Sequence, residues 1–361
     1  MKIPSLLVAA VLPLSFAALA AENGKIVGGP YVVNVTSRSA TIAWLVQTAE
    51  VSVNGPAAKT SPAVRVEKTM LSGLTANTRY DYNVAGTDPA GKGYFKTPPA
   101  TTGAFSFVMY GDNRTRNDVH RGVIQAMLKH GTPDFVVQTG DMVADGFDSS
   151  LWPVFFDIEH DLLRQTAFFP ALGNHERHTP LFAEYFQKPK PYYSFEWGNA
   201  HFAVIDSDLG NVSTHESERA AFWAEQTRWL EEDLKAHQNA DYRFIAAHHG
   251  PITAVARRQG DNPHMIALMP LFEKYRVSAG LFGHDHNYQH YLKNGVHYIV
   301  SGGGGAPLYD VDKPAEGITQ KVMSIENFVA FSVDGKTAHV QTISIDGKVI
   351  DDFEIQAPAT K

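Results

Sequence analysis

The sequence predicts two folded parts, a small all-β sandwich followed by an α/β domain. Between residues 21 and 97, β-branched residues fall in short alternating runs separated by turn signals, which is typical of small β-sandwiches. From residue 104 to 361, short apolar strands alternate with helical stretches, as they do in α/β folds. Residues 98–103 begin with two prolines and continue with small residues, so we expect a linker there.

The first 20 residues have the pattern of a secretory signal peptide. Lys2 is followed by an apolar run that ends in small residues, and we expect cleavage after Ala20. No later stretch has the roughly 18 uninterrupted apolar residues of a spanning helix. The expected protein is therefore periplasmic or secreted, with no membrane association after cleavage.

The charge balance argues against nucleic acid as a bulk partner. The chain carries 31 Lys and Arg against 38 Asp and Glu, which gives a formal net charge of −7. It has no cysteine, which excludes disulfides and thiolate ligands. A small phosphorylated substrate would have to be attracted locally, by metal. Nothing in the sequence indicates an oligomeric state.

In the first part, two alternating runs carry large aromatic residues. Ile42, Trp44 and Val46 share one face of a predicted strand, and Tyr80 and Tyr82 share a face of a later one. This combination of a buried Trp with a late Tyr strand resembles fibronectin type III domains.

In the second part, strands are expected at 105–110 and 135–138, and helices at 118–129 and 217–236. Apolar alternation returns in the segments 328–333, 339–345 and 349–355, which are joined by two Asp-Gly turns. We expect these last strands to complete a second sheet of the large domain.

Five short motifs carry metal-binding residue types, and each ends a predicted strand or follows one directly. They are Gly111-Asp112-Asn113-Arg114, Gly140-Asp141, Gly173-Asn174-His175-Glu176, His248-His249-Gly250-Pro251 and Gly283-His284-Asp285-His286. Carboxylate, amide and imidazole ligands of this kind suit ions such as Zn, Mn and Fe. Open α/β folds place their sites at the carboxyl ends of strands. Together, the motifs predict a metal centre.

In this order the motifs resemble the signature of the calcineurin-like metallophosphoesterases. The fibronectin-like leader and the Gly-Asn-His-Glu and Gly-His-Asp-His-Asn-Tyr runs make the chain most similar to the purple acid phosphatases. The resemblance implies a four-layer α-β-β-α catalytic domain, two metal ions, and hydrolysis of a phosphomonoester by a metal-bound hydroxide. A phosphodiesterase with the same metal core is one alternative. A non-catalytic surface or adhesion protein with a degenerate metal site is another.

Carried across by motif, the resemblance implies two sets of metal ligands that share Asp141 as a bridge. The first set adds Asp112 and His286, and the second adds Asn174, His248 and His284. His175 would protonate the leaving oxygen, so that the expected catalytic residues are His175, Asp112 and Asp141. Gly250 makes the match around His248 and His249 ambiguous. We favour His248 as the ligand and His249 as a contact to substrate.

The first metal site departs from the family pattern. The purple acid phosphatases place a tyrosine three residues after the bridging Asp, where this chain has Ala144. Other metallophosphoesterases place a histidine two residues after the first Asp, where this chain has Arg114, which cannot coordinate a metal. Either His120, from the next helix, or Asn113 could complete the site.

Two further residues are expected to contact substrate. Arg114 suits a phosphate because a guanidinium matches phosphate oxygens bidentately; a surface ion pair is the alternative. Tyr309 follows the glycine run 302–305, which we expect to form a wide turn over the metal site with Tyr309 at the edge of the cleft.

Overall fold

The computed structural model describes residues 24–53, 59–85 and 91–358. The predicted signal peptide over 1–20 lies outside the described residues. Within the described part, no helix has the length and apolar character needed to cross a membrane.

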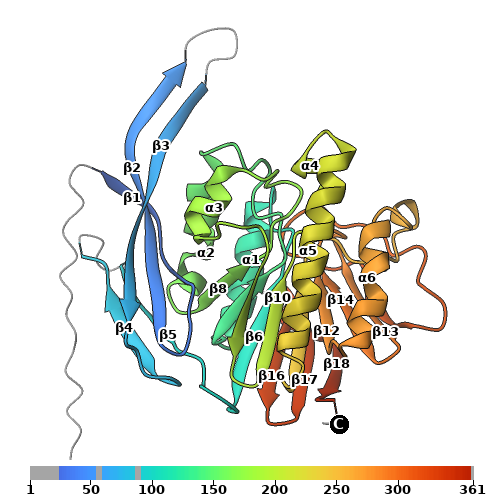
Figure 1. The fold of residues 1–361 in the computed structure, drawn as a ribbon. Coiled ribbons are helices and arrows are strands. Elements are labelled where there is room, and N and C mark those ends of the chain that lie inside the picture. Colours follow the sequence, from blue (N-terminus) through green and yellow to red (C-terminus); the bar gives the residue numbers. More distant parts are fainter. Residues whose placement is uncertain (1–23, 54–58, 86–90, 359–361) are drawn as a thin grey trace, which may run out of the picture.

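Two large β-sheets form the centre of the molecule (Figure 1). The first has nine strands, in the spatial order β18 (Val349–Gln356), β17 (Thr337–Ser344), β16 (Asn327–Asp334), β6 (Phe105–Tyr110), β7 (Phe135–Gln138), β8 (Ala167–Pro170), β1 (Lys25–Val33), β2 (Ser39–Val53) and β3 (Lys59–Ser72). The second has seven, in the order β15 (Thr319–Met323), β13 (Tyr288–Lys293), β14 (Val296–Ser301), β12 (Ala279–Phe282), β11 (Tyr242–Ala246), β10 (Ala200–Val204) and β9 (Tyr193–Trp197). A separate hairpin joins β4 (Arg79–Asn83) to β5 (Lys92–Lys96).

An aromatic core holds the two sheets face to face. The Phe107 ring of β6 lies edge-on to Phe202 and Phe244 of the second sheet, with ring centroids 5.3 and 5.6 Å away. Phe135 of β7 lies 4.4 Å from Trp197 of β9. Such pairs contribute about 0.5–1.5 kcal/mol each beyond the burial of their surface. Aromatic contacts of this kind stabilise the packing of the two inner faces against each other.

Helices cover the two outer faces, which confirms the predicted four layers. On the first sheet lie α1 (Asn117–His130), α2 (Leu151–Leu163) and α3 (Pro180–Phe186), and on the second lie α5 (Glu216–Ala236) and α6 (Pro263–Lys274). Helix α2 shows why: Trp152, Phe155 and Leu162 recur at helical spacing and are buried against the sheet. The short α4 (Leu209–Val212) and η1 (Ala256–Arg258) lie in loops.

The N-terminal region is rich in β-strands, as predicted, but it joins the sheet of the α/β part. Strand β1 pairs in parallel with β8, with Val32 opposite Ala167, so β1, β2 and β3 extend the first sheet. Trp44 lies on the inner face of β2 and contributes to the same core as Phe107. The fibronectin type III identity is therefore not confirmed, and the boundary at 98–103 stays a prediction. Figure 1 shows the β2–β3 hairpin reaching away from the body, on the side opposite α6.

The placement of the C-terminal strands was predicted wrongly. Both Asp-Gly turns form, with Gly335 and Gly347 at φ 56° and 82°. However, β16 pairs with β6 of the first sheet, with Phe331 opposite Phe107. The two rings stack at 4.2 Å, so the C-terminal strands complete the aromatic layer of the first sheet instead of a second sheet.

A histidine pair lies between β13, β14 and β18. His290 Nδ1 is 3.0 Å from Asp351 Oδ2, and His290 Nε2 is 2.9 Å from His297 Nδ1. The Phe353 ring stacks on both histidines. Burial, and then the neighbouring His290, lower the pKa of His297 to about 4. The folded chain therefore keeps this ring neutral in mild acid.

This low pKa predicts a pH-dependent loss of stability. An unfolded histidine has a pKa of about 6.5, so between that pH and about 4 the unfolded chain binds a proton here that the folded chain does not. The free energy of unfolding should fall as the pH falls through this window. His297→Gln should make the thermal midpoint fall less steeply between these pH values than in the wild type. His339→Gln, at an exposed histidine, should leave the slope unchanged; equal slopes in all three proteins would contradict the prediction.

Candidate metal centre

The five motifs follow the carboxyl ends of their strands, as predicted. In the first sheet β6, β7 and β8 run in parallel, and in the second β10, β11 and β12 do. Asp112, Asp141 and Asn174 lie in the loops after β6, β7 and β8. His248 follows β11, and His284 and His286 follow β12. The strands of both sheets therefore deliver their polar residues to the same end of the molecule.

The backbone at these loops is unusual in the way that functional sites often are. Asp112, Asp141 and His284 all have positive φ, at 57°, 59° and 68°. This conformation is uncommon outside glycine, although Asp, Asn and His are enriched in it. Neighbouring glycines allow close approach: a Cβ on Gly173 would lie only 2.3 Å from the Asp141 backbone nitrogen. The loops can converge because the glycine positions between them carry no side chain.

The first set of donors consists of Asp112, Asp141 and His286, whose ligand atoms lie within 4.8 Å of one another. Asp112 Oδ2 accepts the His284 backbone N–H at 2.8 Å, whereas the buried Oδ1 has no hydrogen-bond partner among the described residues. His286 Nδ1 lies 2.7 Å from the Pro307 carbonyl oxygen. A proton donated there leaves Nε2 with a lone pair that faces Asp112 Oδ1 at 3.4 Å. Two buried acceptors that face each other in this way fit a cation.

The second set centres on His248. Its Nδ1 lies 2.8 Å from the Thr139 carbonyl oxygen, so the ring donates there and presents Nε2 to the site. Around Nε2 lie Asn174 Oδ1 at 3.0 Å, His284 Nδ1 at 3.2 Å and Asp141 Oδ1 at 3.4 Å. Asp141 therefore adjoins both sets of donors.

The protonation states of the site favour metal binding. Burial raises the pKa of Asp141, but the positive charges of His248, His175 and Arg114 together lower it by more. The net shift is therefore downward, and the carboxylate stays charged. Burial and the neighbouring histidines hold the pKa of His249 and of His284 well below the usual value. Burial also lowers the pKa of His248, but Asp141 and Asp112 reverse this shift, so a proton and a cation would compete for that ring.

His175 lies at the mouth of the centre. Its Nδ1 is 2.7 Å from the Ala144 carbonyl oxygen, and its Nε2 is 3.8 Å from Asp141 Oδ2. The side chain is 31% exposed, in contrast to the buried His248. One ring nitrogen is thus held by the backbone while the other faces both the donors and the solvent.

Arg114 forms an ion pair within the centre instead of at the surface. Its side chain is only 14% exposed, its Nε is 3.2 Å from Asp141 Oδ2, and its Nη2 is 3.5 Å from His286 Nε2. A guanidinium at this point brings positive charge to the edge of the first set of donors. It could meet a phosphate oxygen there.

His249 and Tyr309 flank the centre on the side of the second sheet. His249 Nδ1 lies 3.0 Å from Ser207 Oγ, and its ring lies 4.1 Å from that of His284. The structure brings His249 as well as His248 close to His284, since the ligand atoms of all three lie within 4.8 Å. The Tyr309 ring stacks on His286 at 4.0 Å, and the Arg258 guanidinium carbon lies 4.8 Å from the centre of the Tyr309 ring.

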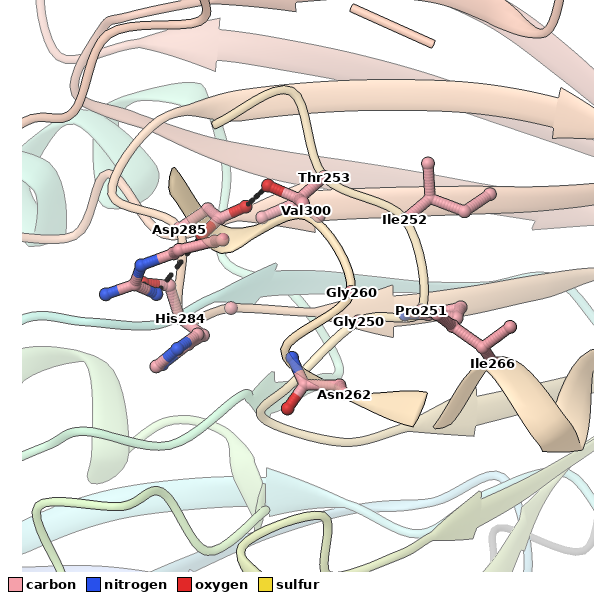
Figure 2. Close-up of a pocket in the computed structure, with 12 residues that line it drawn as sticks. Gly250, Pro251, Ile252, Thr253, Gly260, Asn262, Ile266, His284, Asp285 and Val300 are labelled. Carbon is pink, nitrogen blue, oxygen red and sulfur yellow. Dashed lines mark hydrogen bonds and ion pairs between the residues drawn. The ribbon is translucent and has the colours of Figure 1, made fainter. Parts of the chain in front are cut away.

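A small pocket opens directly beside His284 (Figure 2). Its apolar lining includes Pro251, Ile252 and Val300, and its polar lining includes Asn262 and Arg258. Arg258 Nη1 donates to the His284 carbonyl oxygen at 3.0 Å and lies 3.2 Å from Asp285 Oδ1. The pocket therefore combines an apolar wall with a polar rim next to a candidate ligand.

The structure does not bring His120 or Asn113 to the metal donors. His120 is buried with its Nε2 2.6 Å from Glu159 Oε1 on helix α2. The Asn113 amide nitrogen turns towards His120 at 3.1 Å, and its oxygen accepts from Gln138 at 2.9 Å. We therefore correct the expectation for His120, which forms a buried pair between α1 and α2 instead of completing the first set.

Sequence reasoning missed the positioning role of Glu176. Its buried carboxylate accepts the backbone N–H groups of Gly173, Asp141 and Met142 at 2.8, 2.9 and 2.8 Å. It thereby joins the loop after β7 to the loop after β8. The signal was present, because Glu176 stands in the Gly-Asn-His-Glu run, but no spacing rule predicts backbone acceptors.

Two adjoining sets of carboxylate, amide and imidazole donors that share one buried carboxylate define a candidate dinuclear metal centre. The calcineurin-like phosphoesterase family model matches residues 111–288, which include every donor of both sets. Tartrate-resistant acid phosphatase type 5 of Rattus norvegicus is 30% identical over 201 residues, which cover 47% of this chain and 61% of the rat protein. The chain thus spans about three fifths of that relative's length.

Two solved structures have a similar fold. Purple acid phosphatase PPD1 from yellow lupin (Lupinus luteus) seeds aligns with a TM-score of 0.68 and 18% identity, over 91% of this chain and 74% of that one. PhoD aligns with a TM-score of 0.62 and 11% identity, over 95% of both chains. At these identities the likeness shows the fold alone. The family match and the acid phosphatase relatives are the proteins of known class to which this chain is similar in sequence.

Proposed function

We propose that the protein is an exported phosphatase with a dinuclear metal centre that hydrolyses phosphomonoesters. The observation that carries this proposal is the position of Asp141 between two sets of donors. One set contains Asp112 Oδ1, which is buried and has no hydrogen-bond partner among the described residues. Acid phosphatase relatives and the phosphoesterase family match support the reaction type. The leader-like pattern of residues 1–20 supports a periplasmic or secreted location.

The carboxylate, amide and imidazole donors of the two sets fit two borderline ions such as Fe, Zn or Mn. Asp112, Asp141 and His286 would hold the first, and Asp141, Asn174, His248 and His284 the second. When bound, such ions supply Lewis acidity, which lowers the pKa of a water and offsets phosphate charge. The protein's own part is to fix these donors, and it does so through Glu176 and the carbonyl groups that orient His248 and His286.

His175 is placed to move a proton. Ala144 fixes its Nδ1, which leaves Nε2 as the atom that can give a proton to the oxygen of the leaving alcohol. Its partial exposure lets the ring recover a proton from solvent after each turnover. Among the donor histidines, His248 and His286 are buried and lack this access to solvent.

We expect Arg114 to contribute to substrate binding. Arg114→Gln should lower kcat/KM for an aryl phosphate by about 10- to 100-fold, mainly through KM, because a charge-assisted hydrogen bond to phosphate contributes about 1.5–3 kcal/mol. Steady-state kinetics and metal analysis test this. Arg177→Gln, which removes an exposed arginine paired with Asp145, is the control and should change neither. If the variant lost metal without any change in KM, the role of Arg114 would be to hold Asp141 in place and not to bind substrate.

The proposal favours monoesters, and the pocket beside His284 is where their leaving group would lie. A phosphodiesterase remains the rival with the same centre. Purified protein should be compared on matched aryl phosphate and bis-aryl phosphate substrates. A kcat/KM at least about tenfold higher for the monoester supports the proposal, because it corresponds to about 1.4 kcal/mol of discrimination. The reverse order would assign the protein to diesters.

A further inference from the structure

A second group of metal-binding side chains lies far from the candidate centre. Glu196 of β9, His201 of β10 and His237 at the C-terminus of α5 each offer one ligand atom, and these atoms lie within 4.8 Å of one another. Glu196 and His201 are direct neighbours across the β9–β10 pair. Figure 1 shows α5 running along the outer side of β10. The three residues therefore join the last turn of a helix to the edge of the second sheet.

This group lies at the opposite end of the sheet from the candidate centre. His201 is near the start of β10, whereas His248 follows the end of β11, and the two strands run in parallel. No residue of the group belongs to the motifs that build the centre. Changes here can therefore be tested without touching the donors described above.

His201 has a ring nitrogen in the state that binds metals. Its Nε2 lies 2.7 Å from Asp233 Oδ2, and the buried Nδ1 has no hydrogen-bond partner among the described residues. If Nε2 donates its proton to Asp233, then Nδ1 carries a free lone pair. Asp233 is itself held, since its Oδ1 accepts from Ser194 Oγ at 2.9 Å. A carboxylate that orients a histidine in this way is typical of metal sites.

His237 offers a second free nitrogen. Its Nδ1 lies 2.8 Å from the Asp233 carbonyl oxygen, and it closes the last turn of α5. A proton donated there leaves Nε2 as an acceptor, which faces the Glu196 carboxylate at 3.2 Å. The His201 and His237 rings stack at 3.8 Å. His237 Nε2 and the Glu196 carboxylate are then two acceptors in contact, and such a pair needs a shared cation or an added proton.

We propose that Glu196, His201 and His237 form a second metal site, which binds Zn²⁺ or a similar borderline divalent ion. Two imidazoles and a carboxylate match the ligand preferences of Zn²⁺, with a fourth position open to water at the surface. Metal–ligand bonds of about 2.0–2.2 Å place tetrahedral donors roughly 3.4 Å apart, which is close to the 3.2 Å between His237 Nε2 and Glu196 Oε1. The half-buried His237 ring must leave its stack on His201 for both rings to point a nitrogen at one ion. The ion would tie α5 to the β9–β10 edge.

Equilibrium dialysis of the full-length protein against Zn²⁺ tests this proposal. His237→Gln and Glu196→Gln change a half-buried and an exposed side chain and should leave the fold intact, which circular dichroism can check. Each variant should bind about one Zn²⁺ fewer than the wild type at a concentration that saturates it. The control is His339→Gln, which removes an exposed histidine paired with Asp352 on the neighbouring strand, and it should bind as much as the wild type.

Thermal unfolding gives a second readout. Added Zn²⁺ should raise the midpoint of the wild type more than that of His237→Gln, because an ion that binds only the folded state stabilises it. Both comparisons are differences between proteins with the same catalytic centre, so they hold whether or not the protein is a phosphatase. Equal Zn²⁺ binding and equal midpoint shifts in wild type and both variants would overturn the proposal and leave a proton-linked ion pair.

Discussion

Asp141→Asn is expected to lower the turnover of an aryl phosphate by roughly 10⁴-fold or more, the scale on which enzymes lose a member of a catalytic unit. Asn has nearly the size of Asp, so the surrounding loops can keep their packing. What disappears is the negative charge that adjoins His248, His175 and Arg114. Both sets of donors lose their shared carboxylate, and metal affinity should fall together with activity.

The measurement pairs kcat/KM with metal content and thermal unfolding of the same preparation. Asp145→Asn is the matched control, because Asp145 lies in the same loop but is exposed and pairs with Arg177. It should retain full activity. An Asp141→Asn protein that kept both metals and at least a tenth of the activity would contradict the shared role of Asp141.

His175→Ala should lower kcat by about 10²- to 10⁴-fold, the range that a general acid contributes. Because His175 does not belong to either set of donors, the variant should keep its metals. The loss should also be smaller for a leaving group of low pKa, which needs less help from a proton.

The control for this variant is His215→Ala, at an exposed histidine before α5 that makes no side-chain capping hydrogen bond. Kinetics on two aryl phosphates of different leaving-group pKa, together with metal analysis, separate the roles. Loss of metal equal to that in Asp141→Asn would instead make His175 part of the metal site.

The positions of the metal donors could be predicted because the sequence carries them locally. A glycine followed by Asp, Asn or His after an apolar strand indicates a sharp turn at the strand end. The parallel pairing of β6 and β7 then brings Asp112 and Asp141 together, whereas His248 of the other sheet joins them because the two sheets pack face to face. The alternation of strands and helices predicted an α/β domain, and the four layers were implied by the family resemblance.

The partners of strands and buried polar groups could not be predicted in this way. Alternation shows that β1 and β16 have an apolar face, but not that they pair with β8 and β6. His120 looked like a free imidazole because its partner, Glu159, lies 39 residues along the chain. In hindsight, Glu159 falls on the apolar face of α2, where a carboxylate needs a partner.

The central claim is that this chain holds two metal ions and uses them to hydrolyse phosphate esters. The most direct test loads the mature protein with Mn, Fe or Zn, measures metal content after desalting, and follows hydrolysis of an aryl phosphate, with His237→Gln alongside to subtract the surface site. Close to two metals per chain in that variant, with turnover, is the predicted result. One metal or none, and no turnover with any ion, would contradict it and favour a non-catalytic scaffold.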